Sequence, residues 1–318
     1  MKVSIIIPTY NGVALTKSCL SSLKKNTPAE LLSDIIVVDN ASYDGTVEFL
    51  NSLEWLKVIF SKKNFGFSKA CNQGAEKAKG DILVFLNNDT EVQKGWLEPL
   101  LETIREKDVA VAGSKMIFPN GLVQHAGIVI SKKYIPQHIY YEKKADLPYV
   151  NKIREFQAVT AACMAIKKDI FVSAGGFDEK YLNGMEDIDL CLRVKELGYR
   201  IFYCPESVVV HHESVSVGRF KSVNKNEEIF LKRWKGRVIP DEEKYYREDG
   251  FGWFYIKSKN LRNKYLIGSG RAKDKPFSFK LMRVIYLAFH RIILGAKLVL
   301  KLDFKTLSKK IRKARDAG

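Results

Sequence analysis

The sequence has few cysteines, and no two of them form a C-x-x-C pair. Its five cysteines are scattered over 318 residues, at Cys19, Cys71, Cys163, Cys191 and Cys204. A zinc site needs grouped thiols and a disulfide framework needs regular spacings, so we expect neither. Scattered free thiols suit a reducing compartment, which favours the cytoplasm.

Long apolar runs are also missing. No stretch of about 18 uncharged apolar residues occurs, so we expect no membrane-spanning helix. The first residues, MKVSIIIPTYNG, carry one lysine and an apolar run that ends at Pro8, which is too short for a signal peptide. These absences predict a cytoplasmic protein.

The usual glycine-rich phosphate loops are absent as well. The sequence contains no G-x-G-x-x-G after its first apolar run, where it reads PTYNG, and no G-x-x-x-x-G-K-[ST]. Dinucleotide-binding and P-loop enzymes are therefore excluded. A diphosphate bound without a glycine cradle needs a cation to balance its charge.

Negative charge is scarce at one end of the chain. Residues 257–318 contain 18 Lys and Arg and 3 Asp and Glu, a net charge of +15, whereas residues 1–256 carry only +2 of the total of +17. Such asymmetry indicates a basic segment that meets an anionic surface, either nucleic acid or membrane.

Short apolar runs alternate with helical periodicity in the first 118 residues. The predicted strands cover residues 2–7, 34–39, 56–61, 81–86 and 109–118, and the predicted helices cover 13–25, 44–53, 67–80 and 95–107. Continuous apolar strands alternating with helices indicate an α/β fold, with a parallel sheet covered by helices on both faces.

Polar residues follow four of these strands at the point where each strand ends. They are Thr9, Tyr10 and Asn11; Asp39 and Asn40; Asn64; and Asn88 and Asp89. Asn and Asp suit turns, and any one of these segments alone favours a turn. Ligands of parallel sheets bind at the carboxyl ends of the strands, so four such ends together favour a binding site.

Two aspartates of this rim have a clear chemical use. Asp89 can hold Mg²⁺ or Mn²⁺, which prefer oxygen ligands and bridge phosphate oxygens. Asp39 can accept hydrogen bonds from a base or a ribose. The rim is therefore a candidate site for a nucleoside diphosphate and a divalent metal.

An ordered set of motifs resembles family 2 glycosyltransferases of the GT-A fold, and most of all the bacterial rhamnosyltransferase-like members. The motifs are PTYN, VVDNASYDGT, NFGFSKACNQG, LNNDT, GGFDE and GMEDIDLCLRVKELGYRI, and they span roughly residues 3–235. The resemblance implies a GT-A nucleotide-diphospho-sugar transferase sheet and a metal-dependent, inverting transfer of a sugar.

The resemblance also implies roles for single residues. The expected nucleotide-binding residues are Pro8, Thr9, Tyr10, Asn11, Asp39, Asn64 and Asn88. Asp89 would ligate the metal. Many family members have two or three aspartates where this chain has Asn87, Asn88 and Asp89, so metal binding should rest more heavily on Asp89.

The segment GMEDIDLCL carries three acidic residues at the start of a predicted helix. Negative charge there is favoured by the helix dipole, which explains these residues as well as catalysis does. Asp187 and Asp189 lie about 200° apart around a helix and cannot serve one face. The resemblance implies that Asp187 is the catalytic base and that Glu186 helps to position the acceptor, which leaves Asp189 a local structural role.

Histidines follow the apolar run SVVV. Related enzymes supply a histidine from this region to the metal, and period-two alternation lets only one of His211 and His212 face the site. We favour His211. His125 and His138 have no such support and are expected at the surface or on the acceptor side. Trp96 and Trp234 are expected in the core.

The basic tail forms a predicted amphipathic helix over residues 279–315. Its basic residues fall within an arc of roughly 120° and apolar residues fill most of the rest, as in a helix that lies on a membrane surface. The alternative is a helix docked on the catalytic domain. Nucleic acid fits less well, because the aromatic residues lie on the apolar side.

Together these observations predict two regions and one leading function. Residues 1–235 form the catalytic domain, with a nucleotide-binding half (1–115) and an acceptor half (116–235), and residues 236–318 form a helical, basic, membrane-associating region. The expected enzyme uses Mn²⁺ or Mg²⁺ and moves a sugar such as rhamnose from a nucleotide diphosphate to a glycan or lipid-linked acceptor, in bacterial surface polysaccharide synthesis. It would lie on the inner face of the cell membrane.

Two alternatives stay open. A sugar-phosphate nucleotidyltransferase shares a similar nucleotide-binding sheet, although its glycine-rich loop is missing here. A catalytically inactive, membrane-associated nucleotide-sugar binder would explain the asparagines at Asn87 and Asn88 as a lost metal site.

Overall fold

The computed structural model describes residues 1–212 and 223–251. It separates the chain into two compact units, residues 1–243 and 244–318, and the sheet and core described below belong to the first unit. The predicted helix over 279–315 lies outside the described residues.

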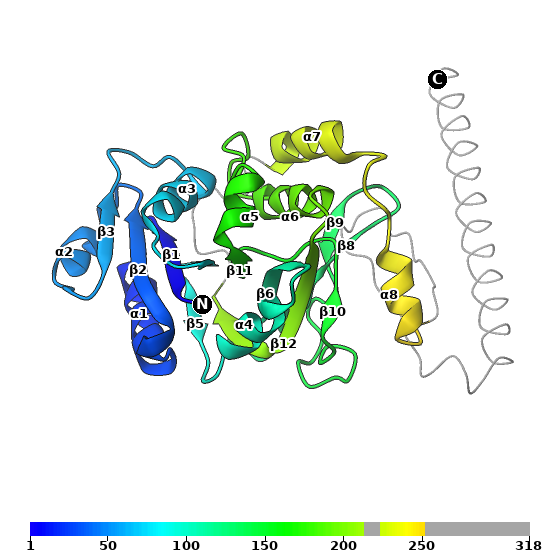
Figure 1. The fold of residues 1–318 in the computed structure, drawn as a ribbon, viewed down its shortest axis with the longest axis horizontal. Coiled ribbons are helices and arrows are strands. Elements are labelled where there is room, and N and C mark those ends of the chain that lie inside the picture. The colour runs from blue at the N-terminus through cyan, green and yellow to red at the C-terminus, as the bar shows by residue number, and fades with distance from the viewer. Residues whose placement is uncertain (213–222, 252–318) are drawn as a thin grey trace, which may run out of the picture. The chain divides into compact units, whose positions relative to one another are not determined.

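Strands and helices mostly alternate along the chain as far as β6, whereas β6 to β11 follow one another with no helix between them (Figure 1). The strands are β1 (Val3–Thr9), β2 (Leu32–Asp39), β3 (Lys57–Phe60), β4 (Ile82–Leu86), β5 (Thr90–Val92), β6 (Val109–Ile117), β7 (Val123–His125), β8 (Ile128–Ile130), β9 (Pro136–His138), β10 (Arg154–Glu155), β11 (Cys163–Lys167) and β12 (Arg200–His211). The helices are α1 (Val13–Asn26), the 3₁₀ turn η1 (Ala29–Leu31), α2 (Thr46–Asn51), α3 (Phe67–Lys77), α4 (Glu98–Arg105), α5 (Lys168–Ser173), α6 (Glu186–Glu196), α7 (Val223–Trp234) and α8 (Glu242–Glu248).

One mixed sheet organises the first unit. Its strand order is β10-β12-β6-β11-β4-β1-β2-β3, with β5 paired to β12 and β7 paired to β6. The five predicted strands, β1 to β4 and β6, run in one direction as expected. However, the sheet is not wholly parallel, because β11 inserts antiparallel between β4 and β6. The pairing of β11 with β4 joins residues about 80 positions apart, which local periodicity does not encode.

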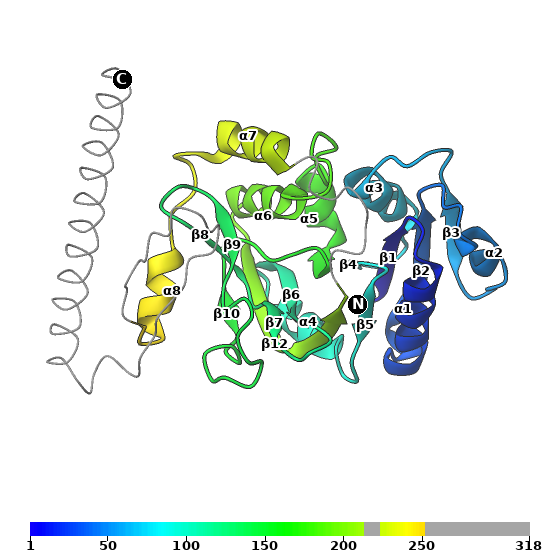
Figure 2. The same cartoon turned by 180° about the vertical axis from the view of Figure 1, so that it is seen from behind.

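Helices cover both faces of this sheet (Figures 1 and 2). Side chains alternate along a strand, so Ile5 and Ile7 of β1 face α1 while Ile6 faces α3. At Gly74 of α3, an added Cβ would lie 2.5 Å from Ile6 Cγ2, so only glycine permits this close approach of helix and strand.

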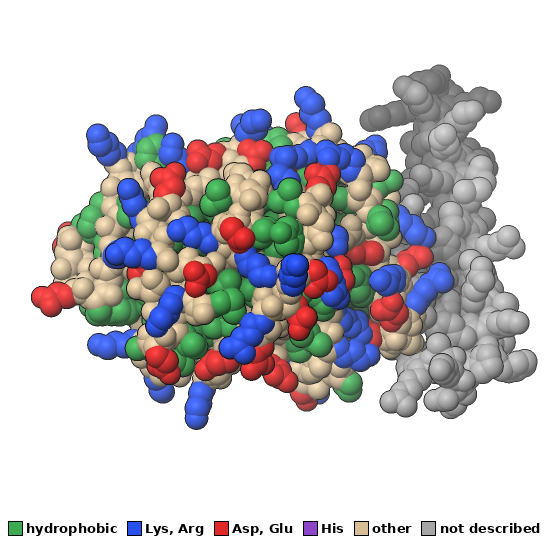
Figure 3. All heavy atoms as spheres, viewed as in Figure 1, with side chains coloured by type: hydrophobic (Ala, Val, Ile, Leu, Met, Phe, Trp, Pro, Cys, Tyr) green, Lys and Arg blue, Asp and Glu red, His purple; other side chains and the backbone are tan. Residues whose placement is uncertain are grey.

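The described surface is mixed in charge. On the face drawn in Figure 3, Lys and Arg side chains lie among Asp and Glu side chains. This mixture agrees with the near-neutral balance of residues 1–256 in the sequence. Within the described residues, no helix is both long and apolar enough to cross a membrane.

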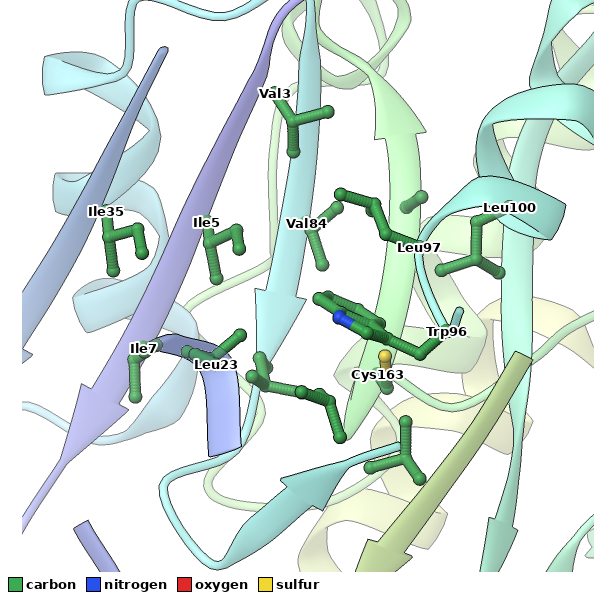
Figure 4. Packing of buried hydrophobic residues seen from close by; sticks show 14 of the residues in the cluster. Val3, Ile5, Ile7, Leu23, Ile35, Val84, Trp96, Leu97, Leu100 and Cys163 are labelled. Atoms are coloured by element: carbon green, nitrogen blue, oxygen red, sulfur yellow. The ribbon is translucent and has the colours of Figure 1, made fainter. Parts of the chain in front are cut away.

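The main core lies between the sheet and α1 and α4 (Figure 4). Trp96 is fully buried beside Val84, Leu97 and Cys163, and its indole Nε1 donates to Thr27 Oγ1 at 3.1 Å. The predicted core position of Trp96 is therefore confirmed. Burial of one such aromatic side chain contributes a large apolar area to stability.

All five cysteines are buried and free. Burial raises the pKa of the Cys19 thiol to about 12, and that of Cys163 likewise, so these thiols stay protonated at neutral pH. The expectation that the cysteines form no disulfide is confirmed.

Candidate active site

The loops that follow β1 and β2 are joined into one rim. Asn11 N–H donates to Ser42 Oγ at 2.7 Å, and Tyr43 N–H donates to Asn11 Oδ1 at 2.9 Å. Asp44 accepts from Gly12 and Val13 N–H at the start of α1. Asn11 itself has a φ of 56°, a left-handed conformation that Asn tolerates better than most residues.

Asp39 ends β2 inside this rim and is only 1 % exposed. Its Oδ2 accepts from Ser42 N–H at 3.0 Å, whereas its buried Oδ1 has no hydrogen-bond partner among the described residues. A buried acceptor without a donor is costly, so a ligand N–H or O–H is the natural partner. This geometry suits the predicted contact to a base or ribose.

Two exposed tyrosines lie at the edge of the rim. The rings of Tyr10 and Tyr43 meet edge to face with centroids 6.1 Å apart, and Tyr43 is 81 % exposed. Exposed rings next to a buried acceptor can contact the flat face of a base. We did not predict Tyr43, although it stands within the motif VVDNASYDGT.

Asn88 ties the ends of β1 and β4 together. Its Nδ2 donates to Thr9 Oγ1 and to Thr16 Oγ1, both at 3.0 Å. The amide therefore holds the first loop in place, and its predicted contact to the ribose stays a prediction. Pro8 is buried within β1.

Asn64 has a local contact in the structure. Its Oδ1 accepts from Gly66 N–H at 2.9 Å, and Asn40 Nδ2 donates to Gly66 O at 3.3 Å. These bonds shape the turn before α3. Asn64 is exposed, and its predicted role in nucleotide binding is untested.

Asp89 and His211 lie side by side. His211 Nε2 is 3.0 Å from Asp89 Oδ1, and their side chains are 4 % and 16 % exposed. His212 instead contacts Glu91, with Nε2 to Oε1 at 2.8 Å. The two rings thus lie on opposite faces of the strand, as alternation predicts, and His211 is the one that reaches Asp89.

This pair fits a divalent metal by its chemistry. A carboxylate oxygen and an imidazole nitrogen are ordinary ligands of Mn²⁺. No group of three or more His, Cys, Asp and Glu side chains that could hold a metal occurs in residues 1–212 and 223–251. A diphosphate and water offer the further oxygen ligands that such a cation prefers.

A short loop with Ala161 and Ala162 connects Asp187 to the turn that contains Asn87 and Asp89. Its Oδ2 accepts from Ala161 N–H at 3.0 Å, and the next residue, Ala162, accepts with its carbonyl from Asn87 N–H at 3.0 Å. The candidate base Asp187 and the turn that carries Asp89 are therefore hydrogen-bonded to two consecutive residues, Ala161 and Ala162. We did not predict this loop, because it contains no residue with catalytic chemistry.

The backbone before α6 is conformationally unusual. Asn183, Gly184 and Met185 have φ values of 55°, 133° and 73° in succession. At the non-glycine residues Asn183 and Met185 a positive φ costs free energy, and such conformations concentrate at functional sites. Glu186 stabilises the turn by accepting from Gly184 N–H, and it is only 6 % exposed. Its role in positioning an acceptor stays a prediction.

Asp189 lies on another side of α6, inside a buried network. It accepts from Trp234 Nε1 at 2.7 Å, from Arg193 Nε at 2.8 Å and from Tyr181 Oη at 3.3 Å. These contacts join α6 to α7 and agree with the local structural role that we predicted. Trp234 is 1 % exposed, so its core position is confirmed.

His125 does not lie at the surface. It is fully buried, with Nδ1 2.9 Å from His138 Nδ1 and Nε2 accepting from Thr160 N–H at 3.5 Å. Of the two predicted positions, surface or acceptor side, the surface position is wrong for His125, because the sequence does not show that β7 pairs with β6. His138 is exposed, as expected.

Solved structures share this fold. A crystal structure of GalNAc-T7 with UDP, GalNAc and Mn²⁺ matches 78 % of this chain and 54 % of its own with a TM-score of 0.57. At 18 % sequence identity the match shows the fold, which is the GT-A architecture of nucleotide-sugar enzymes.

The family follows from the sequence comparison. The model for "Glycosyl transferase family 2" matches residues 4–171. The uncharacterized protein y4gI of Sinorhizobium fredii is 32 % identical over 75 % of this chain, and the O-antigen biosynthesis protein RfbC of Myxococcus xanthus is 31 % identical over 68 %. The chain spans only 28 % and 18 % of the lengths of these two relatives. It belongs to glycosyl transferase family 2.

Proposed function

We propose that this chain transfers a sugar from a nucleoside diphosphate to a hydroxyl group of a glycan or lipid-linked acceptor, with inversion at the anomeric carbon. One observation carries the proposal: Ala161 N–H binds Asp187, and Ala162 O binds the turn that contains Asp89. A group able to accept a proton and a group able to hold a diphosphate through a cation are thereby kept within one small region.

The donor would bind along the rim formed by the loops after β1, β2 and β4. Asp39 Oδ1, buried and without a partner among the described residues, would accept a hydrogen bond from the nucleoside. Tyr10 and Tyr43 would flank the base. Asp89 and His211 would hold Mn²⁺ or Mg²⁺, which would neutralise the charge of the diphosphate and stabilise it as a leaving group.

Asp187 would act as the general base. Its two carboxylate oxygens accept from Ala161 N–H and Ile188 N–H, so its orientation is defined before the acceptor arrives. As the acceptor oxygen bonds to the anomeric carbon, the bond from that carbon to the diphosphate breaks, and the hydroxyl proton passes to Asp187. A single displacement of this kind inverts the anomeric configuration.

The biological role of the reaction is part of the same proposal. The relative RfbC is an O-antigen biosynthesis protein, which supports a place in bacterial surface polysaccharide synthesis with a donor such as a rhamnose nucleotide. The Mn²⁺ in the GalNAc-T7 structure supports a divalent cofactor for this chain.

A donor screen tests the reaction. The full chain is mixed with a panel of nucleotide sugars and Mn²⁺, and release of the nucleoside diphosphate is measured with and without EDTA. We expect release from at least one donor, loss of release with EDTA, and faster release with added glycan acceptor. Formation of a nucleoside triphosphate and a sugar 1-phosphate once pyrophosphate is added would indicate a nucleotidyltransferase instead, and donor binding without any release would indicate an inactive binder.

We also propose that residues 279–315 bind the inner face of the cell membrane. The support is the net charge of +15 on residues 257–318 and the amphipathic pattern of the tail sequence. Each basic residue near an anionic surface contributes about 1 kcal/mol, and the apolar residues enter the acyl boundary. An acceptor carried on a lipid would be met at that surface.

Liposome co-sedimentation tests this association. The full chain should pellet with anionic vesicles, less so at high salt, whereas a chain that ends at Lys275 should stay in the supernatant. Neutral vesicles serve as the control. Equal pelleting of both chains with anionic vesicles would contradict the proposal.

A further inference from the structure

Gln124 lies beneath the candidate metal ligand His211. It is only 4 % exposed, and its Oε1 is 2.6 Å from His211 Nδ1. Gln124 belongs to β7, whereas His211 ends β12, so the contact joins residues that are 87 positions apart.

The contact determines which nitrogen of His211 carries a proton. An amide oxygen only accepts hydrogen bonds, so His211 Nδ1 must be the donor. In the neutral ring the lone pair then belongs to Nε2, which is the nitrogen that points at Asp89 Oδ1. A histidine that binds a metal through Nε2 needs this tautomer.

A β-bulge in β7 sets the direction of the Gln124 side chain. Met116 of β6 pairs with His125 and the next residue, Ile117, pairs with Val123, so Gln124 is an extra residue between two consecutive pairs. Such a β-bulge turns a side chain away from the regular alternation and is frequent next to active sites. The bulge is a second observation, independent of the hydrogen bond.

We propose that Gln124 is a positioning residue for metal binding: it fixes the tautomer and the ring orientation of His211 so that Nε2 is presented to a divalent cation beside Asp89. The proposal rests on the proposed function, in which Asp89 and His211 hold the cation. In this proposal Gln124 acts through His211 and would not itself contact the cation or the nucleotide.

Two substitutions separate the acceptor from the volume of the side chain. Gln124→Leu keeps a similar size and removes the acceptor, whereas Gln124→Glu keeps an acceptor oxygen at the same place. Gln93→Leu is the matched control, because Gln93 is exposed and donates to Glu91 O. Thermal unfolding of each variant verifies that it is folded.

The first measurement is Mn²⁺ affinity of the full chain, read from the electron paramagnetic resonance signal of free Mn²⁺ with UDP or GDP present. We expect Gln124→Leu to weaken binding by about 10- to 100-fold, and Gln124→Glu and Gln93→Leu to bind like the wild type. Wild-type affinity in a folded Gln124→Leu variant would overturn the proposal and leave the proposed function standing. Absence of Mn²⁺ binding to the wild type itself would overturn both.

The second measurement needs no metal and no substrate. Nuclear magnetic resonance of ¹⁵N-labelled histidine reports the protonated nitrogen of each ring, and the chain has five histidines to assign. We expect a proton on His211 Nδ1 in the wild type and in Gln124→Glu, and a shift of the ring toward the Nε2-protonated form in Gln124→Leu. An Nδ1 without a proton in the metal-free wild type would overturn the proposal.

Discussion

Asp89 and His211 are 122 positions apart in the sequence, yet Asp89 Oδ1 and His211 Nε2 lie 3.0 Å from each other. The pairing of β5 with β12 brings them together: His211 pairs with Thr90, and His212 N–H donates to Asp89 O at 2.9 Å. The backbone therefore fixes the spacing of the two side chains before any ligand binds.

Removal of Asp89 should abolish metal-dependent donor binding. Asp89 is the only carboxylate in the run LNNDT, so Asp89→Ala takes away the charged ligand of the pair. Calorimetric titration of UDP and GDP with Mn²⁺ should show binding to the wild type and little or none to the variant. His212→Ala is the control, since His212 contacts Glu91 and should leave the affinity unchanged. Equal affinity of wild type and Asp89→Ala would refute the metal site.

Asp187→Asn should stop transfer without loss of donor binding. The amide keeps the shape of the side chain but cannot take the proton of the acceptor hydroxyl. We expect the transfer rate to fall by about 10² to 10⁴ while the nucleotide affinity stays the same. Glu186→Gln is the comparison. Near-normal turnover of Asp187→Asn together with an inactive Glu186→Gln would show that Glu186 is the general base and that Asp187 positions the acceptor.

Asp39→Asn should weaken nucleotide binding but not the fold. A hydrogen bond from a ligand to a charged acceptor is worth about 1.5–3 kcal/mol, so we expect affinity to fall by about 10- to 100-fold. The free energy of unfolding should be unchanged or higher, because Oδ1 has no protein partner to lose among the described residues. Urea unfolding and nucleotide titration of the same preparation measure both. Unaltered affinity would place the nucleoside elsewhere.

Local pattern was enough to predict the strands β1 to β4 and β6 and the helices α1 to α4. The apolar run before Asn87, for example, marks β4, and the residues after it lie at the rim because strand ends are local events. The contact of Gln124 with His211 could not be predicted, because it depends on a β-bulge and on the strand order. The strand β11, which pairs with β4, was not predicted from the sequence either. Its apolar run is short and is not marked by a distinctive turn.

The burial of His125 also could not be predicted from local pattern. A histidine in GLVQHAG has no hydrophobic signal, so the sequence predicts a position at the surface or on the acceptor side, whereas the structure buries His125 completely. Pattern assigns burial from residue type, but burial of a polar residue is decided by tertiary hydrogen bonds such as the one from Thr160 N–H.

Asp189→Ala should strongly destabilise the first unit. The substitution leaves Arg193 Nε and Trp234 Nε1 without their acceptor in a buried place, and Asp189 itself is 0 % exposed. Loss of one partner of a buried ion pair costs about 3–5 kcal/mol. Urea unfolding measures the change. The control is Asp146→Ala, an exposed aspartate, which should stay within about 0.5 kcal/mol of the wild type.

The stability of the fold should fall in mild acid because of His125. Burial, with His138 as a second cause, holds the pKa of His125 well below the ordinary 6.5. The unfolded chain then binds the proton more readily than the folded one. The free energy that His125 contributes is therefore complete above pH 6.5 and decreases as the pH falls below it, by about 1.4 kcal/mol for each pH unit.

Urea unfolding between pH 8 and pH 5 measures this slope. His125→Gln can still accept from Thr160 N–H but does not titrate. The free energy of unfolding of this variant should therefore lose the part of its decrease below pH 6.5 that corresponds to the uptake of about one proton. His138→Gln should keep most of it, because burial is the larger cause of the lowered pKa of His125 and that substitution leaves His125 buried. An identical pH dependence in the wild type and His125→Gln would show that His125 is not the group whose protonation opposes folding.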